Sequence, residues 1–510
     1  MNEWPITFSL PCGLCVSGIT TWALQHAGIL ADAGRDVRLV VHQADRGHAE
    51  FDVSDLPTLE NVRVVHAPSL TDPGDWQLCI RLYSALLPTI LLPNNLAESY
   101  AVAAALATAQ ADRLRVVGWN HSDNPYDYAC LVYYGPVIHH FVVNTVRCQE
   151  QLRRHLPTRR DAMTLIPHGV QIPSVTLRMP LSGRPLRLIY AGRMEQLVKR
   201  VLDFIELAEL LHEQGVRFEM LLIGDGPQAS DVDQAVSRVN DRLKIDGSSI
   251  RREPPVPPHR LQDHWTRADV SMLASVHEGL SYQMIEAMAC GCVPVISRVD
   301  SGAAELMTEG ENGFTFPVGD VQAMAKCIAG LSRDEPSLRR MSDAARNTVA
   351  EHCGLDRCMV LTAKVWASVE AAPDRPWPTT RSLQMDSLAL LGGATVPNDA
   401  ADRLHRVLKQ IARIHGGPVA IYGAGKHTCA LASVWADSPV EIVGVIDDDP
   451  SRHGRRLWGW PIVGPADAAA TEARAVVISS WMHESTIWQH RHILEAAGLR
   501  VLRLYGKRSL

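Results

Sequence analysis

Short apolar, β-branched runs alternate with longer helix-like stretches along most of this chain, and the alternation restricts the folds open to it. Before residue 167, the helix-like stretches include Thr20–Ala33 and Leu96–Ala109. The strand-like runs are Val37–His42, Val62–His66, Thr89–Leu92, Arg115–Trp119 and His140–Asn144. Strand and helix in repeated alternation predict a parallel sheet with helices on both faces.

The pattern restarts twice, each time after a break. Pro167–Pro185 is rich in Pro, Gly and Ser, and Ala371–Thr380 is dense in Pro, as linkers are. The later strand-like runs are Leu186–Ala191, Phe218–Ile223, Asp269–Ala274, Val293–Ser297, Pro418–Tyr422, Val440–Ile446, Ala475–Ser479 and Val501–Tyr505. A chain of 510 residues is long enough for three domains. We predict an α/β fold with domains at 1–178, 179–370 and 399–510 and a linker at 371–398.

Residues 278–291, Glu-Gly-Leu-Ser-Tyr-Gln-Met-Ile-Glu-Ala-Met-Ala-Cys-Gly, contain two carboxylates, Glu278 and Glu286, on either side of an expected helix start. Ser281 is typical of a helix N-cap, and the residues after it are apolar at helical spacing. Amide N–H groups at that start would attract a phosphate. The two carboxylates could accept hydrogen bonds from sugar hydroxyls. This is the chemistry that holds a nucleotide-sugar.

Two cations follow the first strand of the second series. The strand ends in the segment Tyr190-Ala191-Gly192-Arg193, and Lys199 comes six residues after Arg193, just before the next expected helix. Ligands of open parallel sheets bind beyond the carboxyl ends of the strands, where a diphosphate would lie between these side chains. There the cations would neutralise a departing nucleoside diphosphate. The alternative is a pair of surface ion pairs, which the carboxylate segment after a later strand of the same sheet makes less favourable.

Residues 186–331 resemble the nucleotide-binding half of glycosyltransferase family 4, the retaining GT-B enzymes. The matching segments, in the order and spacing of that family, are YAGRMEQLVKR, LLIGDGP, ADVSMLAS, EGLSYQMIEAMACGCVPV, SGAAEL and NGFTFPVGD. The resemblance extends over roughly residues 1–370 and is strongest in the second series. It implies two Rossmann-like domains that face each other across a cleft. A terminal helix at Leu355–Ala371 would cross back to the first domain.

The resemblance also implies roles for individual residues. Arg193 and Lys199 match the basic pair that binds pyrophosphate. Glu286 matches the carboxylate that binds the ribose, and Glu278 matches the one near the donor sugar. The remaining donor-binding positions implied are Gly192, Ser281, Tyr282 and Gln283. The segment departs from the Glu-Gly-Phe-Gly common in the family, which bears on the choice of sugar more than on the reaction.

Two further positions come from the first series. Gly18 precedes a helix in a loop that resembles the family's glycine-containing loop near the acceptor and the donor phosphates, where glycine lets the backbone approach a ligand. His121 follows a strand and matches the family's histidine near the reacting sugar. For most of the 21 histidines a buried structural role is the expected one, and only position favours His121. Ile166–Val170 resembles the segment that leads into the second domain, and we interpret it as structural.

No metal and no other cofactor is predicted. A metal-dependent GT-A enzyme would need Asp-x-Asp at the end of a strand, whereas Asp231–Asp233 opens a helix, where capping explains it. Cys12–Cys15 is a Cys-x-x-Cys that cannot complete a tetrahedral zinc site without a second such pair. The ligand expected is a nucleoside diphosphate sugar, as donor substrate.

The third series begins with a glycine turn between a strand and a helix start, which contains Gly423, Gly425 and His427. Asp447 ends the next strand, where a Rossmann unit places its ribose-binding acid. The third glycine of the dinucleotide fingerprint is missing. The unit resembles small Rossmann domains of nucleotide-binding type that are appended to sugar-modifying enzymes and methyltransferases. Binding of a nucleotide at these four residues and a purely structural or dimerising role both stay open.

The charge and the apolar stretches of the chain limit the kinds of partner that it can have. The net charge of −6, with no long basic run, argues against a nucleic-acid partner. No apolar stretch is long enough to span a bilayer, and the first ten residues lack the features of a signal peptide. We therefore expect a cytoplasmic protein with reduced cysteines. Peripheral contact with the inner face of the membrane and a homodimer stay open.

The function predicted from the sequence is a metal-independent retaining glycosyltransferase. It would move a sugar from a nucleoside diphosphate to an acceptor hydroxyl, in the synthesis of a polysaccharide, glycolipid or glycoconjugate. Two alternatives are a non-catalytic protein that binds nucleotide-sugars, and a bifunctional enzyme with a second sugar-modifying activity in residues 399–510.

Overall fold

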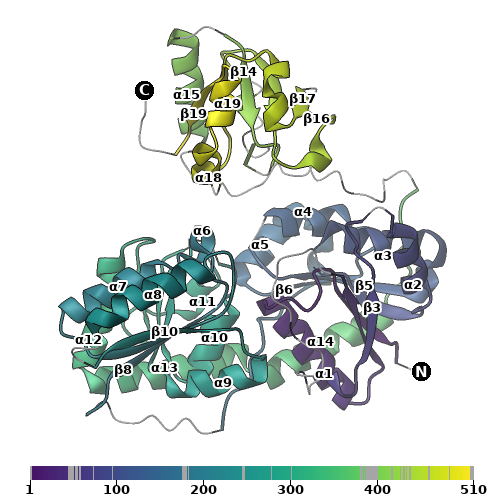
Figure 1. The fold of residues 1–510 in the computed structure, drawn as a ribbon. Coiled ribbons are helices and arrows are strands. Elements are labelled where there is room, and N and C mark those ends of the chain that lie inside the picture. Colours follow the sequence, from purple (N-terminus) through teal and green to yellow (C-terminus); the bar gives the residue numbers. More distant parts are fainter. Residues whose placement is uncertain are drawn as a thin grey trace. The chain divides into compact units, whose positions relative to one another are not determined.

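The structure, a computed structural model, describes most of residues 3–505. The ranges outside the description are 44–50, 52–55, 57–58, 73, 95, 124, 175–180, 182, 244–246, 277, 300, 380–382, 384, 386–399, 415–416, 426, 429–430, 432–433, 436–437, 458–459 and 482. Much of the predicted linker, 371–398, therefore lies outside the described residues. The described part confirms the α/β fold, with three sheets built mainly of parallel strands (Figure 1).

The chain divides into two compact units. Unit 1 consists of Met1–Asp123 and Cys130–Gln384, and unit 2 of Asn124–Ala129 and Met385–Leu510. Two of the sheets belong to unit 1 and one to unit 2. We call the part of unit 1 around the first sheet the first lobe and the part around the second sheet the second lobe. The predicted boundary between them, after residue 178, stays a prediction.

The first sheet is parallel throughout, with strand order β3-β2-β1-β4-β5-β6-β7. Its strands are β1 (Ile6–Leu10), β2 (Val37–His42), β3 (Arg63–Ala67), β4 (Thr89–Leu92), β5 (Leu114–Asn120), β6 (His140–Val143) and β7 (Met163–Leu165). The helices between them are α1 (Gly18–Asp32), α2 (Trp76–Ser84), α3 (Ala97–Gln110), α4 (Pro125–Tyr133) and α5 (Val146–His155), with 3-10 turns at Ala111–Arg113 and Pro157–Ala162.

The second sheet is also parallel, with strand order β10-β9-β8-β11-β12-β13. Its strands are β8 (Leu186–Ala191), β9 (Phe218–Ile223), β10 (Ser249–Glu253), β11 (Val270–Leu273), β12 (Val293–Ser297) and β13 (Phe314–Phe316). Its helices are α6 (Gln196–Lys199), α7 (Asp203–Glu213), α8 (Ala229–Leu243), α9 (Pro258–Arg267), α10 (Tyr282–Ala289), α11 (Ala303–Leu306), α12 (Val321–Arg333), α13 (Glu335–Cys353) and α14 (Leu355–Glu370).

The sheet of unit 2 has the order β16-β17-β15-β14-β18-β19, parallel except for the β16–β17 hairpin. Its strands are β14 (Val419–Tyr422), β15 (Ile442–Ile446), β16 (Arg456–Leu457), β17 (Trp460–Val463), β18 (Ala475–Ile478) and β19 (Arg500–Arg503). Its helices are α15 (Ala400–Ile414), α18 (Glu484–Gln489) and α19 (His492–Ala496), with 3-10 turns at Pro450–Arg452 and Pro465–Thr471.

Helix α14 runs from the second lobe to the first, and Figure 1 shows its green ribbon beside α1. At its end, Glu370 accepts a hydrogen bond from the main-chain N–H of Trp4 at 3.3 Å. The same carboxylate forms an ion pair with Arg35 at 2.6 Å. Both partners belong to the first lobe, so the end of α14 returns the chain from the second lobe to the first.

Candidate functional site

The loops after β8 and β9 pack closely at the carboxyl edge of the second sheet. Gly224 has a φ of +143°, and a Cβ added there would overlap the main-chain oxygen of Gly192. The Tyr190 hydroxyl donates to the main-chain oxygen of Arg193 at 2.8 Å. At position 224, only glycine permits this backbone conformation and the close approach to Gly192. Contacts with Gly224 and with Tyr190 therefore fix the loop that holds Gly192 and Arg193, both of which were predicted to contact the donor.

Lys199 and Glu278 meet at this edge. Lys199 Nζ lies 2.6 Å from Glu278 Oε1, and the Ser275 hydroxyl donates to the same oxygen at 2.6 Å. The main-chain N–H of Val276 donates to the oxygen of Val198 at 2.9 Å, which ties the Glu278 loop to α6. A predicted cation and a predicted sugar-binding carboxylate, 79 positions apart in sequence, are thus direct neighbours.

Arg193 makes a different contact. Its side chain is 47% exposed and lies 3.5 Å from Glu195 Oε2. The surface ion pair that the sequence left as an alternative is the contact Arg193 makes here, and its role as a phosphate ligand stays a prediction.

Helix α10 begins at this edge as its sequence predicts. Ser281 is its N-cap, and its hydroxyl accepts a hydrogen bond from the main-chain N–H of Met284 at 3.4 Å. Gln283 donates from Nε2 to the main-chain oxygen of Met272 at 2.8 Å. A Cβ added to Gly192 would lie 3.5 Å from Gln283 Oε1, so the first turn of α10 borders the Gly192 loop.

Glu286 lies one turn further along α10 and is half-buried. Burial raises the pKa of its carboxyl from 4.5 to about 7, and an interaction with the indole of Trp265 on α9 opposes part of that shift. A carboxyl held in this way ionises more readily when it gains hydrogen-bond donors. The two hydroxyls of a ribose would be such donors.

The first lobe reaches this edge through its glycine loop. Gly18 begins α1, and a Cβ added there would touch the Tyr282 side chain at 3.4 Å. The Tyr282 hydroxyl donates to the main-chain oxygen of Gly169 at 3.3 Å, and its ring lies 4.8 Å from that of His168. Tyr282 therefore joins the start of α10 to two loops of the first lobe.

His121 is buried at the end of β5. Its Nε2 lies 3.0 Å from Asn94 Oδ1, and Asn94 donates its own amide to the main-chain oxygen of Ser9, so the histidine nitrogen is the donor. Burial, with the nearby His168 and His26 adding to it, holds the pKa of His121 well below its usual range. His121 is therefore neutral at physiological pH, with a proton on Nε2.

The residues that support His121 were not predicted from the sequence. The Asn144 amide donates to the main-chain oxygen of His121 at 2.9 Å and lies 3.0 Å from His168 Nε2. The rings of His121 and His168 stack with centroids 6.0 Å apart. Asn144 and Asn94 each follow a strand of the first sheet, which is the signal that could have identified them. The motif Ile166–Val170 predicted only a structural role for His168, and no other feature of the sequence indicated its contact with His121.

The glycine turn of unit 2 is closed by Asp447. Its carboxylate accepts a hydrogen bond from the main-chain N–H of Ala424 at 2.5 Å and pairs with Arg452 at 3.2 Å. Gly423, with a φ of +106°, and Gly425 form the turn. These contacts show the buried carboxylate of Asp447 holding the turn together, and its role as a ribose ligand stays a prediction.

His427 in the same unit lies between two hydroxyls. Its Nδ1 is 3.0 Å from Ser479 Oγ and its Nε2 is 2.6 Å from the Tyr505 hydroxyl. Burial lowers the pKa of His427 to about 4. All four residues predicted in unit 2 therefore lie at the carboxyl ends of β14 and β15, together with Ser479 after β18.

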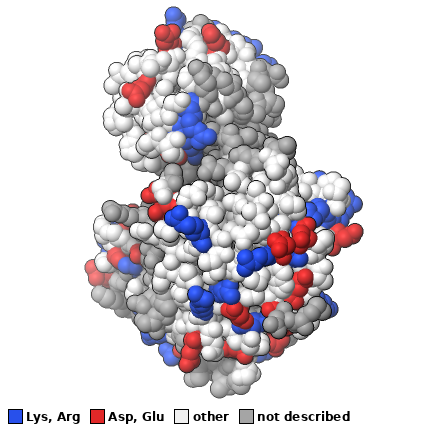
Figure 2. All heavy atoms as spheres, turned by 90° about the vertical axis from the view of Figure 1, so that its right-hand side faces the viewer, with Lys and Arg blue, Asp and Glu red and all other residues white. Residues whose placement is uncertain are grey.

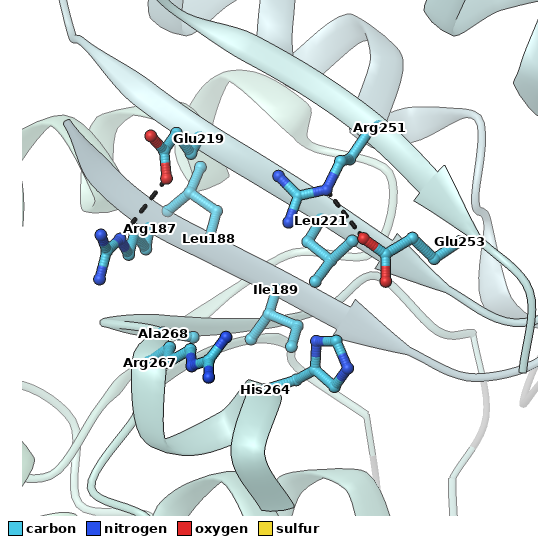
Figure 3. Close-up of a pocket in the computed structure, with 10 residues that line it drawn as sticks. All are labelled: Arg187, Leu188, Ile189, Glu219, Leu221, Arg251, Glu253, His264, Arg267 and Ala268. Atoms are coloured by element: carbon cyan, nitrogen blue, oxygen red, sulfur yellow. Dashed lines mark hydrogen bonds and ion pairs between the residues drawn. The ribbon is translucent and has the colours of Figure 1, made fainter. Parts of the chain in front are cut away.

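A separate hollow of about 340 Å³ lies on one face of the second sheet, over β8, β9 and β10 beside α9 (Figure 3). Two ion pairs line it, Arg187 with Glu219 at 3.5 Å and Arg251 with Glu253 at 2.9 Å. None of the residues predicted above lines this hollow.

Other surface features are plain. On the face drawn in Figure 2, basic and acidic side chains are interspersed. Among the described residues, no group of three or more His, Cys, Asp or Glu side chains is placed to hold a metal ion. No helix in the described part of the chain is long and apolar enough to cross a membrane. Metal independence and a cytoplasmic location stay predictions.

Comparison with known proteins places the second lobe. Residues 185–334 match the family Glycosyl transferases group 1. A putative colanic acid biosynthesis glycosyltransferase of Salmonella typhimurium is 31% identical over 193 residues, which are 36% of this chain and 45% of the relative. An amylovoran biosynthesis glycosyltransferase of Erwinia amylovora is 30% identical over 175 residues, 32% of this chain and 40% of the relative. The chain thus spans less than half of the length of these two curated relatives.

Solved structures share the fold of a larger part of the chain. The structure of Anabaena Alr3699/HepE in complex with UDP and glucose has a TM-score of 0.58 and 15% identity, and the match covers 72% of this chain and all (100%) of that one. The lipopolysaccharide outer core galactosyltransferase WaaB in its apo form has a TM-score of 0.52 and 16% identity, covering 71% of this chain and 99% of that one. The chain therefore has the GT-B fold, and its second lobe matches the glycosyl transferases group 1 family.

Proposed function

We propose that this chain is a retaining glycosyltransferase that transfers a sugar from a nucleoside diphosphate to an acceptor hydroxyl. The observation that carries the proposal is the meeting of the Lys199–Glu278 pair with the Gly192 loop and the start of α10 at one sheet edge. A diphosphate needs a cation, a backbone that it can approach closely and the N–H groups of a helix start, and its sugar needs a carboxylate. This edge of the sheet has all four.

The first task of this site is to stabilise the departing diphosphate. Lys199 has three N–H donors, so it can hold Glu278 and a phosphate oxygen together. Arg193, which is exposed at the same edge, can turn from Glu195 to the phosphates. The amides at the start of α10 add positive potential there. Charge stabilisation of this kind in a preorganised site is worth a few kcal/mol per donor, roughly 10²–10³ in rate.

The second task is to orient the two ends of the donor. Glu286 would accept hydrogen bonds from the ribose hydroxyls, which favours its ionised form. Glu278 would accept from a hydroxyl of the sugar. Gly18 leaves room for the backbone of the first lobe beside Tyr282, and a larger residue there would press on that ring.

The transfer step that we propose proceeds on one face of the sugar. The bond between the anomeric carbon and the diphosphate oxygen breaks, and the acceptor oxygen bonds to the same face of that carbon. The acceptor proton passes to the departing diphosphate. His121, neutral and with Nε2–H directed at Asn94, would act as a hydrogen-bonding wall near the sugar and not as an acid. No residue is assigned as a covalent nucleophile, and no metal is required.

The biological setting that we propose is the synthesis of a polysaccharide or other glycoconjugate. The names of the Salmonella and Erwinia relatives, which concern colanic acid and amylovoran, support it. The Anabaena neighbour was solved with UDP and glucose, which makes UDP-sugars the first donors to test. A cytoplasmic enzyme with access to the inner face of the membrane would meet both donors and lipid-linked acceptors.

The test is release of nucleoside diphosphate from UDP, GDP, ADP and TDP sugars, with and without added acceptors. We expect release from one donor class, and at least a tenfold loss of turnover in Arg193→Ala and in Lys199→Ala. Arg267→Ala is the matched control, because this exposed arginine lies on α9 away from the predicted residues. Binding of a donor with neither transfer nor hydrolysis would instead support the non-catalytic alternative.

Unit 2 offers a second candidate activity only if it binds a nucleotide. Its glycine turn at the carboxyl end of β14 is the observation in favour, since ligands of open α/β sheets bind at such ends. Equilibrium dialysis of the full chain with NAD and with UDP, compared between wild type and Gly425→Val, tests it. Binding that the substitution abolishes would support a site in unit 2.

A further inference from the structure

One carboxylate of the second lobe caps a helix of the first lobe. Glu305, on α11, accepts hydrogen bonds from the main-chain N–H groups of Val146 at 2.9 Å and Arg147 at 3.0 Å. These are the first two residues of α5, in the first lobe. The first N–H groups of a helix have no partner within it, and a negative charge is favourable there. The hydroxyl of Thr145, the N-cap, accepts from the next N–H, that of Cys148, at 3.0 Å.

The segment that contains Glu305 is also tied to the predicted donor site. The main-chain N–H of Gly302 donates to the oxygen of Gly279 at 3.1 Å. Gly279 follows Glu278 directly. A Cβ added to Gly279 would lie 3.1 Å from Ser122 Cα, and one added to Gly302 would overlap the methyl group of Thr145. The glycines therefore let this part of the second lobe lie directly against the strand-end loops of the first.

On the first-lobe side, the start of α5 is tied to the His121 loop. The Arg147 guanidinium forms an ion pair with Asp123, two residues after His121. Asn144, just before α5, donates to the main-chain oxygen of His121 at 2.9 Å. A continuous series of contacts thus runs from Glu305 through α5 to His121, and from Gly302 through Gly279 to Glu278.

We propose that Glu305 is a positioning residue that holds the two lobes in register for transfer. By capping α5 across the lobes, it places Glu278 of one lobe and His121 of the other around the same donor sugar. It touches neither substrate nor reacting atoms. This inference rests on the proposed transferase function, because it assigns the two ends of the contact series to one donor.

Loss of the Glu305 cap should lower the rate of turnover and leave nucleotide binding nearly unchanged. Lys199, Glu286 and the start of α10 all belong to the second lobe, so a nucleoside diphosphate keeps its main contacts when the cap is lost. The sugar, however, loses the aligned His121. We therefore expect Glu305→Ala to lower kcat by about tenfold, the change that follows from about 1.4 kcal/mol in the barrier. The affinity for UDP should change less than twofold.

Two variants and one control test this. Glu305→Ala removes both acceptors, and Glu305→Gln keeps one oxygen and loses the charge, so its kcat should fall between wild type and Glu305→Ala. Glu311→Gln is the control, since this exposed carboxylate lies on the same lobe near α11 and forms no hydrogen bond in the described structure. Amide exchange read at Val146 and Arg147 reports the cap itself, independently of activity.

The expected result is fast exchange at these two amides in Glu305→Ala, an unchanged melting temperature within a few degrees, and the kcat loss with preserved UDP affinity. Unchanged exchange at both amides would overturn the cap. Faster exchange with wild-type kcat would overturn the positioning role. If wild type transfers no sugar from any donor, the proposed function fails, while the exchange measurement still decides whether Glu305 caps α5.

Discussion

Replacement of Glu286 by Gln should stabilise the fold at alkaline pH and weaken nucleotide binding. The pKa of this carboxyl rises from 4.5 to about 7 on folding, chiefly through burial. A carboxyl whose pKa is raised on folding favours the folded state at pH values below its pKa in the unfolded chain. That contribution to the free energy of unfolding is lost as the pH rises through its pKa in the folded protein. Glutamine has no charge to bury, so the variant lacks this pH dependence.

The magnitude follows from the shift. At roughly 1.4 kcal/mol per pKa unit, the full difference is about 3 kcal/mol, of which about 2.5 kcal/mol falls between pH 5 and pH 8. Because Glu286 is only half-buried, solvent screening reduces the expected change to about 2 kcal/mol. The free energy of unfolding of the variant, relative to wild type, should increase by that amount over this pH range.

The assay is urea denaturation of both proteins at pH 5 and pH 8, with Glu311→Gln as the control that should show no such difference. A ribose that donates to Glu286 also predicts that the variant binds UDP at least tenfold more weakly, the loss of a charge-assisted hydrogen bond. A stability difference that is the same at both pH values would refute the burial argument. Unchanged UDP affinity would refute the ribose assignment.

Three other predictions concern the remaining groups. The pKa of buried His121 lies well below its usual range, so His121 should not titrate near pH 6.5. The pH–rate profiles of wild type and His121→Asn should therefore have the same shape around pH 6.5. An inflection there in wild type that is lost in His121→Asn would contradict the neutral role. Transfer should continue at an undiminished rate after dialysis against EDTA, and a loss that Mg²⁺ or Mn²⁺ restores would contradict metal independence. Asp447→Ala should lower the unfolding free energy of unit 2 by about 1–3 kcal/mol, because it leaves the buried N–H of Ala424 without an acceptor. In the same variant, a loss of nucleotide binding in equilibrium dialysis with unchanged stability would contradict the structural role and show that Asp447 binds the ligand instead.

The interior strands of the three sheets were predictable because burial on both faces requires continuous apolar sequence. β8, β9 and β12 occupy the predicted ranges without change. β10 was missed, because its sequence, Ser-Ile-Arg-Arg-Glu, belongs to a strand at the edge of the sheet, where charged side chains are favourable. β1 was missed as well, although it is fully buried, because a single short run at the start of a chain has no preceding helix to mark it.

In the candidate site, too, the features that depend on local sequence were predictable and the contacts that depend on the packing of distant segments were not. The N-cap role of Ser281 follows from local chemistry, and the structure confirms it. The contact of Lys199 with Glu278 depends on the order of β8 and β11 in the sheet, which sequence periodicity does not determine. The contacts of His121 with Asn94 and His168 depend on the packing of three separate loops, and the spacing of these residues in the sequence does not predict them. Glu305 lies in the matched segment SGAAEL, yet its partners are main-chain N–H groups 159 and 158 positions earlier in the chain, and the sequence carries no signal for a contact of that range.

The central claim is that the donor binds at the carboxyl edge of the second sheet, and amide exchange of the full chain with and without a saturating nucleotide-sugar tests it most directly. We predict slower exchange in Gly192–Lys199, in Glu278–Ala289 and around Gly18, with unit 2 unchanged. Protection confined to the glycine turn of unit 2, or absent from all three segments while the ligand is bound, would contradict this account.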